Sequence, residues 1–446
     1  MYGLACFVPP DLLHEIARTA RTAALRRSAL DSLAIDAAIR TQRAENAART
    51  LTVPMSASAG SGVPQRFIHD QRNGADMTPG PVVRAEGQPP VDDPAVNQAY
   101  DNFGDTYKFY WEVLNRDSLD DQGMPIHGMV HFDTDYNNAF WDGEGHMWFG
   151  DGDGKVFGSF TEPVDVLGHE FTHAVTQFSA ALTYQDQSGA LNESVSDCFG
   201  TCLKQRLLGQ TADQADWLVG EGIFLSGINA RALRDMAHPG TAYDDPTLGQ
   251  DPQVGDMADY VDTTDDNGGV HTNSGIPNRA FYLAATAIGG DTWEGAGQIW
   301  YAALTGGQVV ADTDFAGFAA ATVAAAGDHA DAVRTAWETV GVEVGASSGS
   351  AGGTPGGGAG AGLVRVRRTG GIAGRTVEAE LDLASADDRA SAAQDLVDRI
   401  DLTEPADTST FPDAFSYTFE IGDRSVTVPQ HQLSADQRAL ADLLLG

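Results

Sequence analysis

The sequence of 446 residues predicts an α+β protein made of a β-rich lobe, an α-helical lobe and a small α+β domain. Short runs rich in β-branched and aromatic residues, separated by Gly, Asp and Asn, fill residues 65–162 and predict strands. Ala-rich segments with apolar residues at helical spacing fill residues 163–344. Nine glycines in residues 345–362 predict a flexible linker, because such a composition cannot build a core. Residues 363–446 then show strand-like alternation around a helical segment.

Residues 1–50 predict a separate helical unit ahead of the two lobes. They hold seven arginines against five acidic residues, whereas the whole chain has a net charge of −36. Pro9 and Pro10 interrupt the first apolar run and no basic region precedes it, so we expect no signal peptide. The protein is therefore expected to be cytoplasmic or to be secreted by a leaderless route. Residues 51–64 are uncharged and rich in small residues, which predicts an exposed connector.

The composition excludes several classes of partner. With 63 acidic and 27 basic residues, the surface repels phosphate, so we expect no nucleic-acid partner. No apolar run approaches the ~18 residues that a membrane span requires, so we expect no membrane partner. Three cysteines in a chain of this length cannot form a disulfide framework.

The segment VDVLGHEFTHAVTQF carries the strongest chemical signal. His169 and His173 are four residues apart, so on a helix both imidazoles can reach one ion. Glu170 points about 100° to one side, where it can meet a metal-bound water without being a ligand. Glu193, on a later helical stretch, would complete a three-ligand zinc site that leaves a fourth position for water. Asp197, one turn further on, is placed to accept the free ring N–H of a ligand histidine.

Five motifs then point to one family. HEFTHAV, TYQDQSGALNESVSD, NNAFWDG, GDGDG and DDNGGVHTNSGIPNRAF occur within residues 64–343. Together they resemble the thermolysin-like zinc metallopeptidases. The resemblance implies a two-lobed fold with the active-site helix between the lobes, and an endopeptidase acting on proteins or peptides. It implies one zinc ion bound by His169, His173 and Glu193, with Glu170 as the general base.

The resemblance also implies how the transition state is held. His271, in GGVHTNSG, matches the histidine that stabilises the developing oxyanion. Asp266 matches the carboxylate that keeps this imidazole oriented and protonated. Tyr184 matches the phenol that helps to hold the same oxygen atom.

Substrate binding is implied in the same way. Asn138 and the backbone of Ala139 match groups that hold the peptide in an extended form. Arg234 matches the residue that holds a carbonyl beside the scissile bond, with Arg231 as the alternative. Cleavage before bulky hydrophobic residues is implied by two apolar pocket walls, Val166 and Leu233.

Calcium is the point at which the chain departs from the family. Asp165, Asp216 and Glu221 match acidic ligands of a paired calcium site, but Lys204 stands where a bridging glutamate is expected. An ammonium group cannot ligate Ca²⁺, so two adjacent ions are not expected. We therefore expect one calcium ion with fewer oxygen ligands, and electrostatic substitution by Lys204 is the alternative.

The two ends of the chain narrow the branch of the family. The start, CFVPPDLL with its PPDLL motif, resembles the propeptide of protealysin-like members, and residues 363–446 resemble emfourin, a proteinaceous inhibitor of such enzymes. The resemblance implies a precursor whose propeptide and C-terminal domain both inhibit the enzyme intramolecularly. In a second interpretation the C-terminal domain binds substrate or a partner. In a third, the protein is a catalytically silent scaffold that binds peptides. A Cys6 thiolate that blocks zinc is a further alternative for the propeptide.

Overall fold

A computed structural model describes residues 5–47 and 62–344, together with the C-terminal ranges 363–370, 377–383, 389–397, 399–400, 415–421, 424–429 and 433–445. The chain divides into two compact units, residues 1–349 and residues 350–446. The predicted linker lies outside the described residues, as does most of the predicted connector. Among the described residues, no helix is long and apolar enough to cross a membrane.

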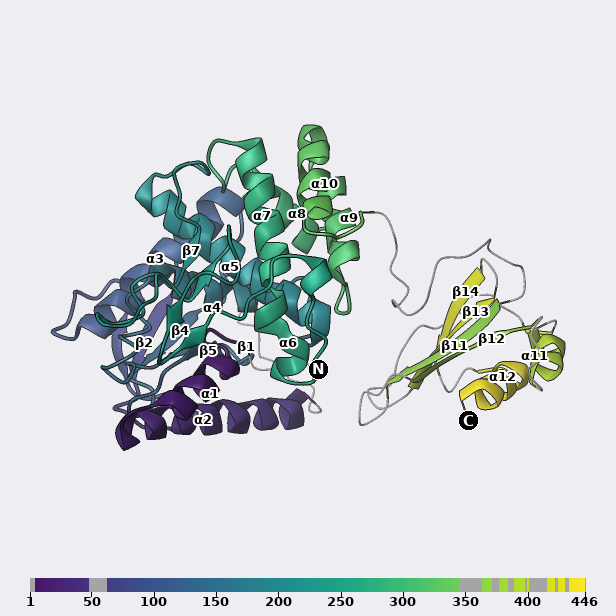
Figure 1. The fold of residues 1–446 in the computed structure, drawn as a ribbon, viewed down its shortest axis with the longest axis horizontal. Helices are drawn as coiled ribbons and strands as arrows, with labels where there is room; N and C mark the ends of the chain where they lie inside the picture. The colour runs from purple at the N-terminus through teal and green to yellow at the C-terminus, as the bar shows by residue number, and fades with distance from the viewer. Residues whose placement is uncertain are drawn as a thin grey trace. The chain divides into compact units, whose positions relative to one another are not determined.

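The first unit contains a mixed six-stranded sheet (Figure 1). Its strands, in spatial order, are β1 Ala5–Cys6, β5 Ala139–Trp141, β6 His146–Phe149, β4 Ile126–Val130, β2 Arg66–Asp70 and β3 Val82–Ala85. The pairs β2–β4 and β4–β6 are parallel and the others antiparallel. The edge strand β1 comes from the N-terminal segment and places Cys6 opposite Phe140. The sequence had indicated only helices in this segment.

A long helix, α3 Pro94–Leu114, lies in the lobe that the sequence predicted as β-rich. Asp93 caps its N-terminus by accepting hydrogen bonds from the backbone of Ala95 and Val96, and Pro94 fits the first turn. The helix packs its apolar face against β2 and β4. The β-rich prediction for this lobe is therefore incomplete.

The α-helical lobe follows the sheet, as predicted. Its helices are α4 Val164–Gln177, α5 Asp186–Leu208, α6 Asp266–Asn273, α7 Gly275–Ile288, α8 Ala296–Thr305, α9 Phe315–Ala325 and α10 Ala330–Thr339, with the short 3₁₀ helices η1 Met257–Asp259 and η2 Gly327–His329. Between α5 and α6 the chain forms loops and the two-residue strands β7 Leu218–Val219, β8 Arg234–Asp235, β9 Asp244–Asp245 and β10 Gly249–Gln250. Helices α4 and α5 pack against each other and carry the candidate metal ligands.

Residues 5–47, which we call the leader, pack on residues 62–344, which we call the catalytic body. Its helices, α1 Pro10–Thr19 and α2 Ala23–Ala47, pack against each other and lie near the β1–β5 edge of the sheet (Figure 1). Pro10 occupies the first helical position of α1, where its missing N–H costs nothing. Leu13 and Ile16 are fully buried in the same hydrophobic core as the body.

The second unit is a four-stranded antiparallel sheet with two helices. Its strand order is β12 Val377–Asp382, β11 Leu363–Gly370, β13 Phe415–Ile421 and β14 Arg424–Pro429. The helices are α11 Ala390–Val397 and α12 Ala435–Leu445, and α12 packs on β11 and β12. Val364, Phe419 and Leu440 are fully buried at the centre of a separate core.

Candidate active site

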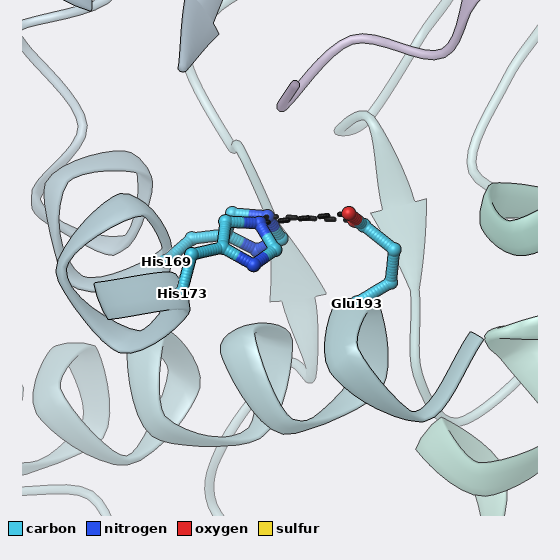
Figure 2. Close-up of side chains that lie close together, drawn as sticks. All are labelled: His169, His173 and Glu193. Carbon is cyan, nitrogen blue, oxygen red and sulfur yellow. Dashed lines mark hydrogen bonds and ion pairs between the residues drawn. The ribbon is translucent and has the colours of Figure 1, made fainter. Parts of the chain in front are cut away.

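Two helices bring three candidate metal ligands together. His169 and His173 project from α4 and Glu193 projects from α5, and all three side chains are buried (Figure 2). The Nε2 atoms of the two histidines lie 2.9 Å apart. Nε2 of His169 lies 3.4 Å from Glu193 Oε2, and Nε2 of His173 lies 3.5 Å from Glu193 Oε1. The predicted ligand atoms therefore converge on one point.

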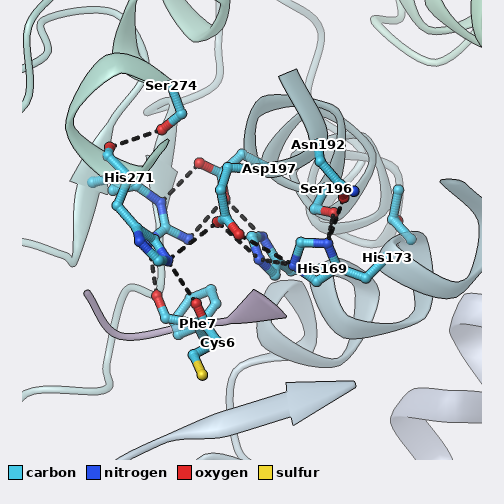
Figure 3. Close-up of polar contacts among 12 residues, drawn as sticks. Cys6, Phe7, His169, His173, Asn192, Ser196, Asp197, His271 and Ser274 are labelled. Atoms are coloured by element: carbon cyan, nitrogen blue, oxygen red, sulfur yellow. Dashed lines mark hydrogen bonds and ion pairs between the residues drawn. The ribbon is translucent and has the colours of Figure 1, made fainter. Parts of the chain in front are cut away.

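The opposite ring nitrogen of each histidine is also held. Nδ1 of His169 donates to Asp197 Oδ1 at 2.9 Å, as the sequence analysis expected. Nδ1 of His173 lies 2.8 Å from Asn192 Oδ1 and 3.0 Å from Ser196 Oγ (Figure 3). The sequence analysis missed Asn192 and Ser196, although both lie on the same helix as Glu193. These contacts orient both imidazoles toward the convergence point.

The charges around this point fit a zinc ion. Burial opposes a charge on His169, but Asp197 and Glu193 raise its pKa to about 9. Burial and the neighbouring charge on His169 lower the pKa of His173 to about 3. The Glu193 carboxylate faces both imidazoles, so the set offers one negative charge and two ring nitrogens to a divalent cation. Two histidines and one glutamate are a known donor set for catalytic zinc.

Glu170 lies on α4 between the two histidines and is fully buried. Burial raises the pKa of Glu170 to about 8. It does not belong to the group of converging ligand atoms, which agrees with the expectation that it is no ligand.

His271, on α6, and Tyr184, just before α5, lie close to the same point. Nδ1 of His271 donates to Asp266 Oδ1 at 2.9 Å, and the His271 backbone N–H donates to Asp266 Oδ2. Burial opposes the charge, but Asp266 and Glu193 raise the pKa of His271 to about 9. The Tyr184 hydroxyl donates to Glu193 and lies 3.4 Å from His271 Nε2. Gly268, whose φ is +85°, packs so closely on Asp186 that a side chain could not fit.

The leader enters the site through strand β1 and the residues that follow it. The Phe7 N–H donates to the Ala139 carbonyl at 3.0 Å, and the Val8 N–H donates to Asn138 Oδ1 at 2.8 Å. Nε2 of His271 donates to the Cys6 carbonyl at 2.8 Å (Figure 3). The carbonyl oxygen of Cys6, and not its thiol, makes this contact. The Cys6 side chain packs in an apolar cluster.

Arg234 binds both the leader and the site. Its Nη1 donates to the Phe7 carbonyl at 2.9 Å, while Nε and Nη2 donate to the two oxygens of Asp197 at 2.7 and 2.8 Å. Arg231, the alternative from the sequence, instead pairs with Asp235, and its side chain is half exposed. Only Arg234 thus contacts the cleft residues described here. Asn278, which the sequence analysis missed, also donates to Asp197.

The Phe7 ring fills an apolar pocket. The ring is fully buried and meets the His169 ring edge to face, with 5.1 Å between centroids. The guanidinium carbon of Arg234 lies 4.7 Å from the centroid of the Phe7 ring. The predicted pocket walls, Val166 and Leu233, belong to the same buried cluster as Phe7.

A second part of the leader grips the loop that leads into β5. Asp36 is buried and accepts hydrogen bonds from the Tyr136 hydroxyl at 2.6 Å and from Asn138 Nδ2 at 3.1 Å. Asn137 donates through Nδ2 to Ser28 Oγ at 2.6 Å. These contacts were not predicted from the sequence, because the partners lie 100 and 109 residues apart. The same carboxamide of Asn138 therefore binds Asp36 and the leader strand.

The predicted calcium region contains an ammonium group at its centre. Nζ of Lys204 lies 3.0 Å from Glu221 Oε2 and 3.2 Å from Asp216 Oδ1. Asp165 accepts a hydrogen bond from the Gly220 backbone at 2.9 Å. Because a positive charge already occupies the space among these carboxylates, the residues do not fit a calcium ion. Of the two possibilities left by the sequence, this geometry favours the electrostatic substitution.

Comparison with known proteins agrees with the fold and the site. Residues 36–177 match the family model described as "Thermolysin metallopeptidase, catalytic domain", and residues 180–342 match "Thermolysin metallopeptidase, alpha-helical domain". Residues 366–445 match the family model described as "Emfourin".

Individual relatives show the same relationship. The chain is 53% identical over 288 residues to an "Extracellular metalloprotease" of Pectobacterium carotovorum subsp. carotovorum, an alignment that covers 64% of this chain and 82% of the relative. It is 49% identical over 285 residues to "Protease PrtS" of Photorhabdus, covering 62% of this chain and 76% of the relative. The solved structure "Precursor of Protealysin, Metalloproteinase from Serratia proteamaculans" matches with a TM-score of 0.69 and 48% identity, over 76% of this chain and 99% of that one.

The fold and the three-ligand site together define a zinc metalloprotease. The chain belongs to the thermolysin metallopeptidase family and has the form of a protealysin-like precursor with an emfourin domain at its C-terminus. The predicted family, fold class and enzyme class are confirmed.

Proposed function

We propose that this chain is a latent endopeptidase that cleaves before bulky hydrophobic residues and is inhibited by its own leader. The observation that carries the proposal is the position of the leader in the cleft. The Cys6 carbonyl accepts from His271, the histidine that the family resemblance assigns to the oxyanion. The backbones of Phe7 and Val8 bind groups that the resemblance assigns to the substrate peptide, namely Ala139, Arg234 and Asn138. Phe7 then occupies the place of the residue that follows the scissile bond.

The residues of the chain suit the chemistry of peptide hydrolysis. When bound, zinc supplies a Lewis acid that acidifies water and polarises the peptide carbonyl. Glu170 takes a proton from the attacking water and delivers it to the leaving amine. His271, kept charged by Asp266, and Tyr184 donate hydrogen bonds to the carbonyl oxygen as negative charge develops there.

Residues around these groups bind and orient the substrate. Asn138 and Ala139 hold the peptide backbone as an additional strand beside β5, in the manner of Phe7 and Val8. Arg234 fixes the carbonyl of the residue after the scissile bond and is itself held by Asp197. The buried pocket around Phe7 favours a large apolar side chain at this position.

Inhibition by the leader follows from the same contacts. A peptide substrate needs the hydrogen-bonding groups that Cys6, Phe7 and Val8 occupy, so it cannot bind while the leader is in place. The contact of Asp36 with Asn138 adds a second hold outside the cleft strand. Proteolysis within residues 45–66 would separate the leader from the catalytic body and allow its dissociation.

We also propose that the C-terminal domain is a second intramolecular inhibitor. Its match to the emfourin model and its separate hydrophobic core support this role. The alternative is a domain that binds substrate or a partner. It would be favoured if separately expressed residues 363–446 did not inhibit the enzyme. The cytoplasmic or leaderless secreted location stays a prediction.

A direct assay tests the proposed activity. Purified protein, before and after removal of the leader, is incubated with casein and with quenched peptides, with and without o-phenanthroline. We expect activity only after leader removal, loss of activity with the chelator, and cleavage before Phe or Leu. Chelator-resistant activity would contradict the mechanism. No activity from zinc-loaded protein that lacks both the leader and residues 363–446 would favour the silent scaffold, an interpretation that the intact Glu170 and His271 argue against.

A further inference from the structure

Lys204 holds one short segment of the helical lobe through all of its N–H donors. Its ammonium group contacts Asp216 Oδ1 at 3.2 Å, the Leu218 carbonyl at 3.2 Å and Glu221 Oε2 at 3.0 Å. The Lys204 side chain is only 11% exposed. Burial opposes the charge, but Asp165 and Asp216 raise the pKa of Lys204 above its usual value. The lysine is therefore a fixed cation at the centre of the segment.

Asp165 holds the same segment from the side of α4. Its Oδ2 atom accepts a hydrogen bond from the Gly220 backbone N–H at 2.9 Å, and the carboxylate is almost completely buried. Asp165 lies one helical turn before His169, and Lys204 lies on the helix that carries Glu193. The two helices that present the zinc ligands thus also fix the segment 216–221.

This segment forms part of the pocket that surrounds Phe7. A Cβ atom added to Gly220 would lie 3.1 Å from Cε1 and Cζ of the Phe7 ring and 3.2 Å from Cβ of Leu233. Gly220 also has a φ of +70°, which disfavours any side chain. Next to it, Val219 pairs with Arg234, which binds the Phe7 carbonyl. A small shift of the segment would therefore change the space available to an aromatic ring.

We propose that Lys204 is a positioning residue for substrate specificity: its ammonium group takes the place of a bound cation and fixes Gly220 against the bulky residue that follows the scissile bond. This inference rests on the proposed function, in which Phe7 marks the substrate position. It assigns the segment 216–221 to the specificity pocket and makes that pocket independent of calcium.

The experiment compares kcat/KM for three peptides that differ only in the residue after the cut, which is Phe, Leu or Ala. The full chain after leader removal is assayed as wild type, Lys204→Met and Lys204→Arg. We expect Lys204→Met to lower the ratio of Phe to Ala about tenfold, mainly through a higher KM for Phe. Lys204→Arg keeps the positive charge and should restore a large part of this ratio. Lys108→Met, at an exposed lysine of α3, is the matched control and should leave the ratio unchanged.

The outcomes separate the inference from the proposed function. A wild-type enzyme with no preference for Phe or Leu over Ala would contradict the proposed specificity itself. A wild-type preference that Lys204→Met leaves intact, or an equal loss for all three peptides, would overturn only the role of Lys204. If Lys204→Met does not fold, Lys204→Gln takes its place. An unchanged ratio of Phe to Ala in Lys204→Arg together with a lower ratio in Lys204→Gln would then support the role in specificity. An equal loss of kcat/KM for all three peptides in both variants would overturn the inference.

A second measurement tests the independence from calcium. Addition of about 10 mM calcium chloride, enough to fill even weak protein sites, should change neither the Tm of the wild-type enzyme nor its ratio of Phe to Ala. A ratio that depends on calcium would overturn the proposal, because a divalent cation would then be fixing the segment.

Discussion

Glu170 stands on α4 between the two histidines and lies within the buried site without joining their convergence point. A carboxylate in this position could act as a metal ligand or as a general base. Replacing it with an amide would reduce zinc binding in the first case, and would reduce only kcat in the second.

We expect Glu170→Gln to retain about one zinc ion per chain while lowering kcat by at least about 10²-fold, since the isosteric amide cannot accept a proton. Zinc is measured by elemental analysis and activity with a quenched peptide after leader removal. Glu338→Gln, at an exposed residue of α10, is the matched control and should behave as wild type. Loss of zinc together with activity would assign Glu170 to metal binding instead.

Arg234 offers a second test at single-residue scale. Its planar guanidinium group contacts both oxygens of Asp197 and the Phe7 carbonyl at once, which a lysine cannot reproduce. We expect Arg234→Lys to lower kcat/KM at least about tenfold. Arg231→Lys, at a half-exposed side chain that contacts Asp235 and not the leader, should stay within about threefold. Equal effects of the two substitutions would contradict the assignment of Arg234 to the cleft.

Single residues could be predicted from sequence where the partners lie on one or two helices. His169 and His173 share a helical face, and Glu193 follows in a segment with its own recognisable motif. The contact between Asp36 and Asn138 could not be predicted in this way, because it depends on how a separate helix docks on the sheet edge. Asn192 was accessible in principle, since it lies beside Glu193 on α5, but its role depends on the direction of the His173 ring.

At the scale of elements, α3 is the helix that the β-rich prediction for residues 65–162 did not include. Asn, Asp and Gly residues, which also occur in turns, are frequent in the first half of Pro94–Leu114. The polar residues among them lie mostly on one face of an amphipathic helix, while the apolar face packs on the sheet. Strand β1 was missed for a different reason. Two residues carry no periodicity, and their extended form depends on pairing with β5.

Helix α2 gives a prediction about maturation. Asp36 accepts hydrogen bonds from Tyr136 and Asn138 in a buried setting, so Asp36→Asn would present an amide to two donors. We expect the leader to bind more weakly and the precursor to mature severalfold faster, since loss of such buried hydrogen bonds costs about 1–3 kcal/mol. Maturation is followed by gel electrophoresis and N-terminal sequencing, with the new terminus expected within residues 45–66.

This prediction has a matched control on the same helix. Asp31→Asn, at an exposed position of the same helix, should mature at the wild-type rate. Because the leader is removed, all three precursors yield a mature enzyme of identical sequence, so their final kcat/KM values must agree. An Asp36→Asn precursor that matures as slowly as wild type would show that the cleft strand alone retains the leader.

At the scale of the whole molecule, the second unit has the parts of an independent domain. Its sheet, its two helices and a core that includes Val366 and Leu444 belong to residues 350–446 alone. Covalent linkage to the catalytic unit would raise its local concentration to roughly millimolar, as is typical of short linkers, so that even a micromolar inhibitor would act in cis.

We expect the separately expressed residues 363–446 to inhibit leader-free enzyme that ends at Gly345. Inhibition should rise with added domain, and the full chain without its leader should already be less active than the truncated form. The measurement is initial rate against domain concentration, with heat-denatured domain as the control. Full activity at about 1 mM added domain, the roughly millimolar local concentration that a short linker supplies, would favour a domain that binds substrate or a partner.

The proposed use of one pocket by both Phe7 and the substrate has a consequence for how such enzymes can diverge. A substitution that reshapes the pocket, for example at Leu233, alters the fit of the target peptide and of position 7 at the same moment. An enzyme that acquires a new cleavage preference would therefore also need a changed residue at position 7, because otherwise its leader would bind the altered pocket more weakly and inhibit it less. On this proposal, we expect position 7 and the pocket walls to change together, so the residue at position 7 would indicate which side chain the pocket prefers.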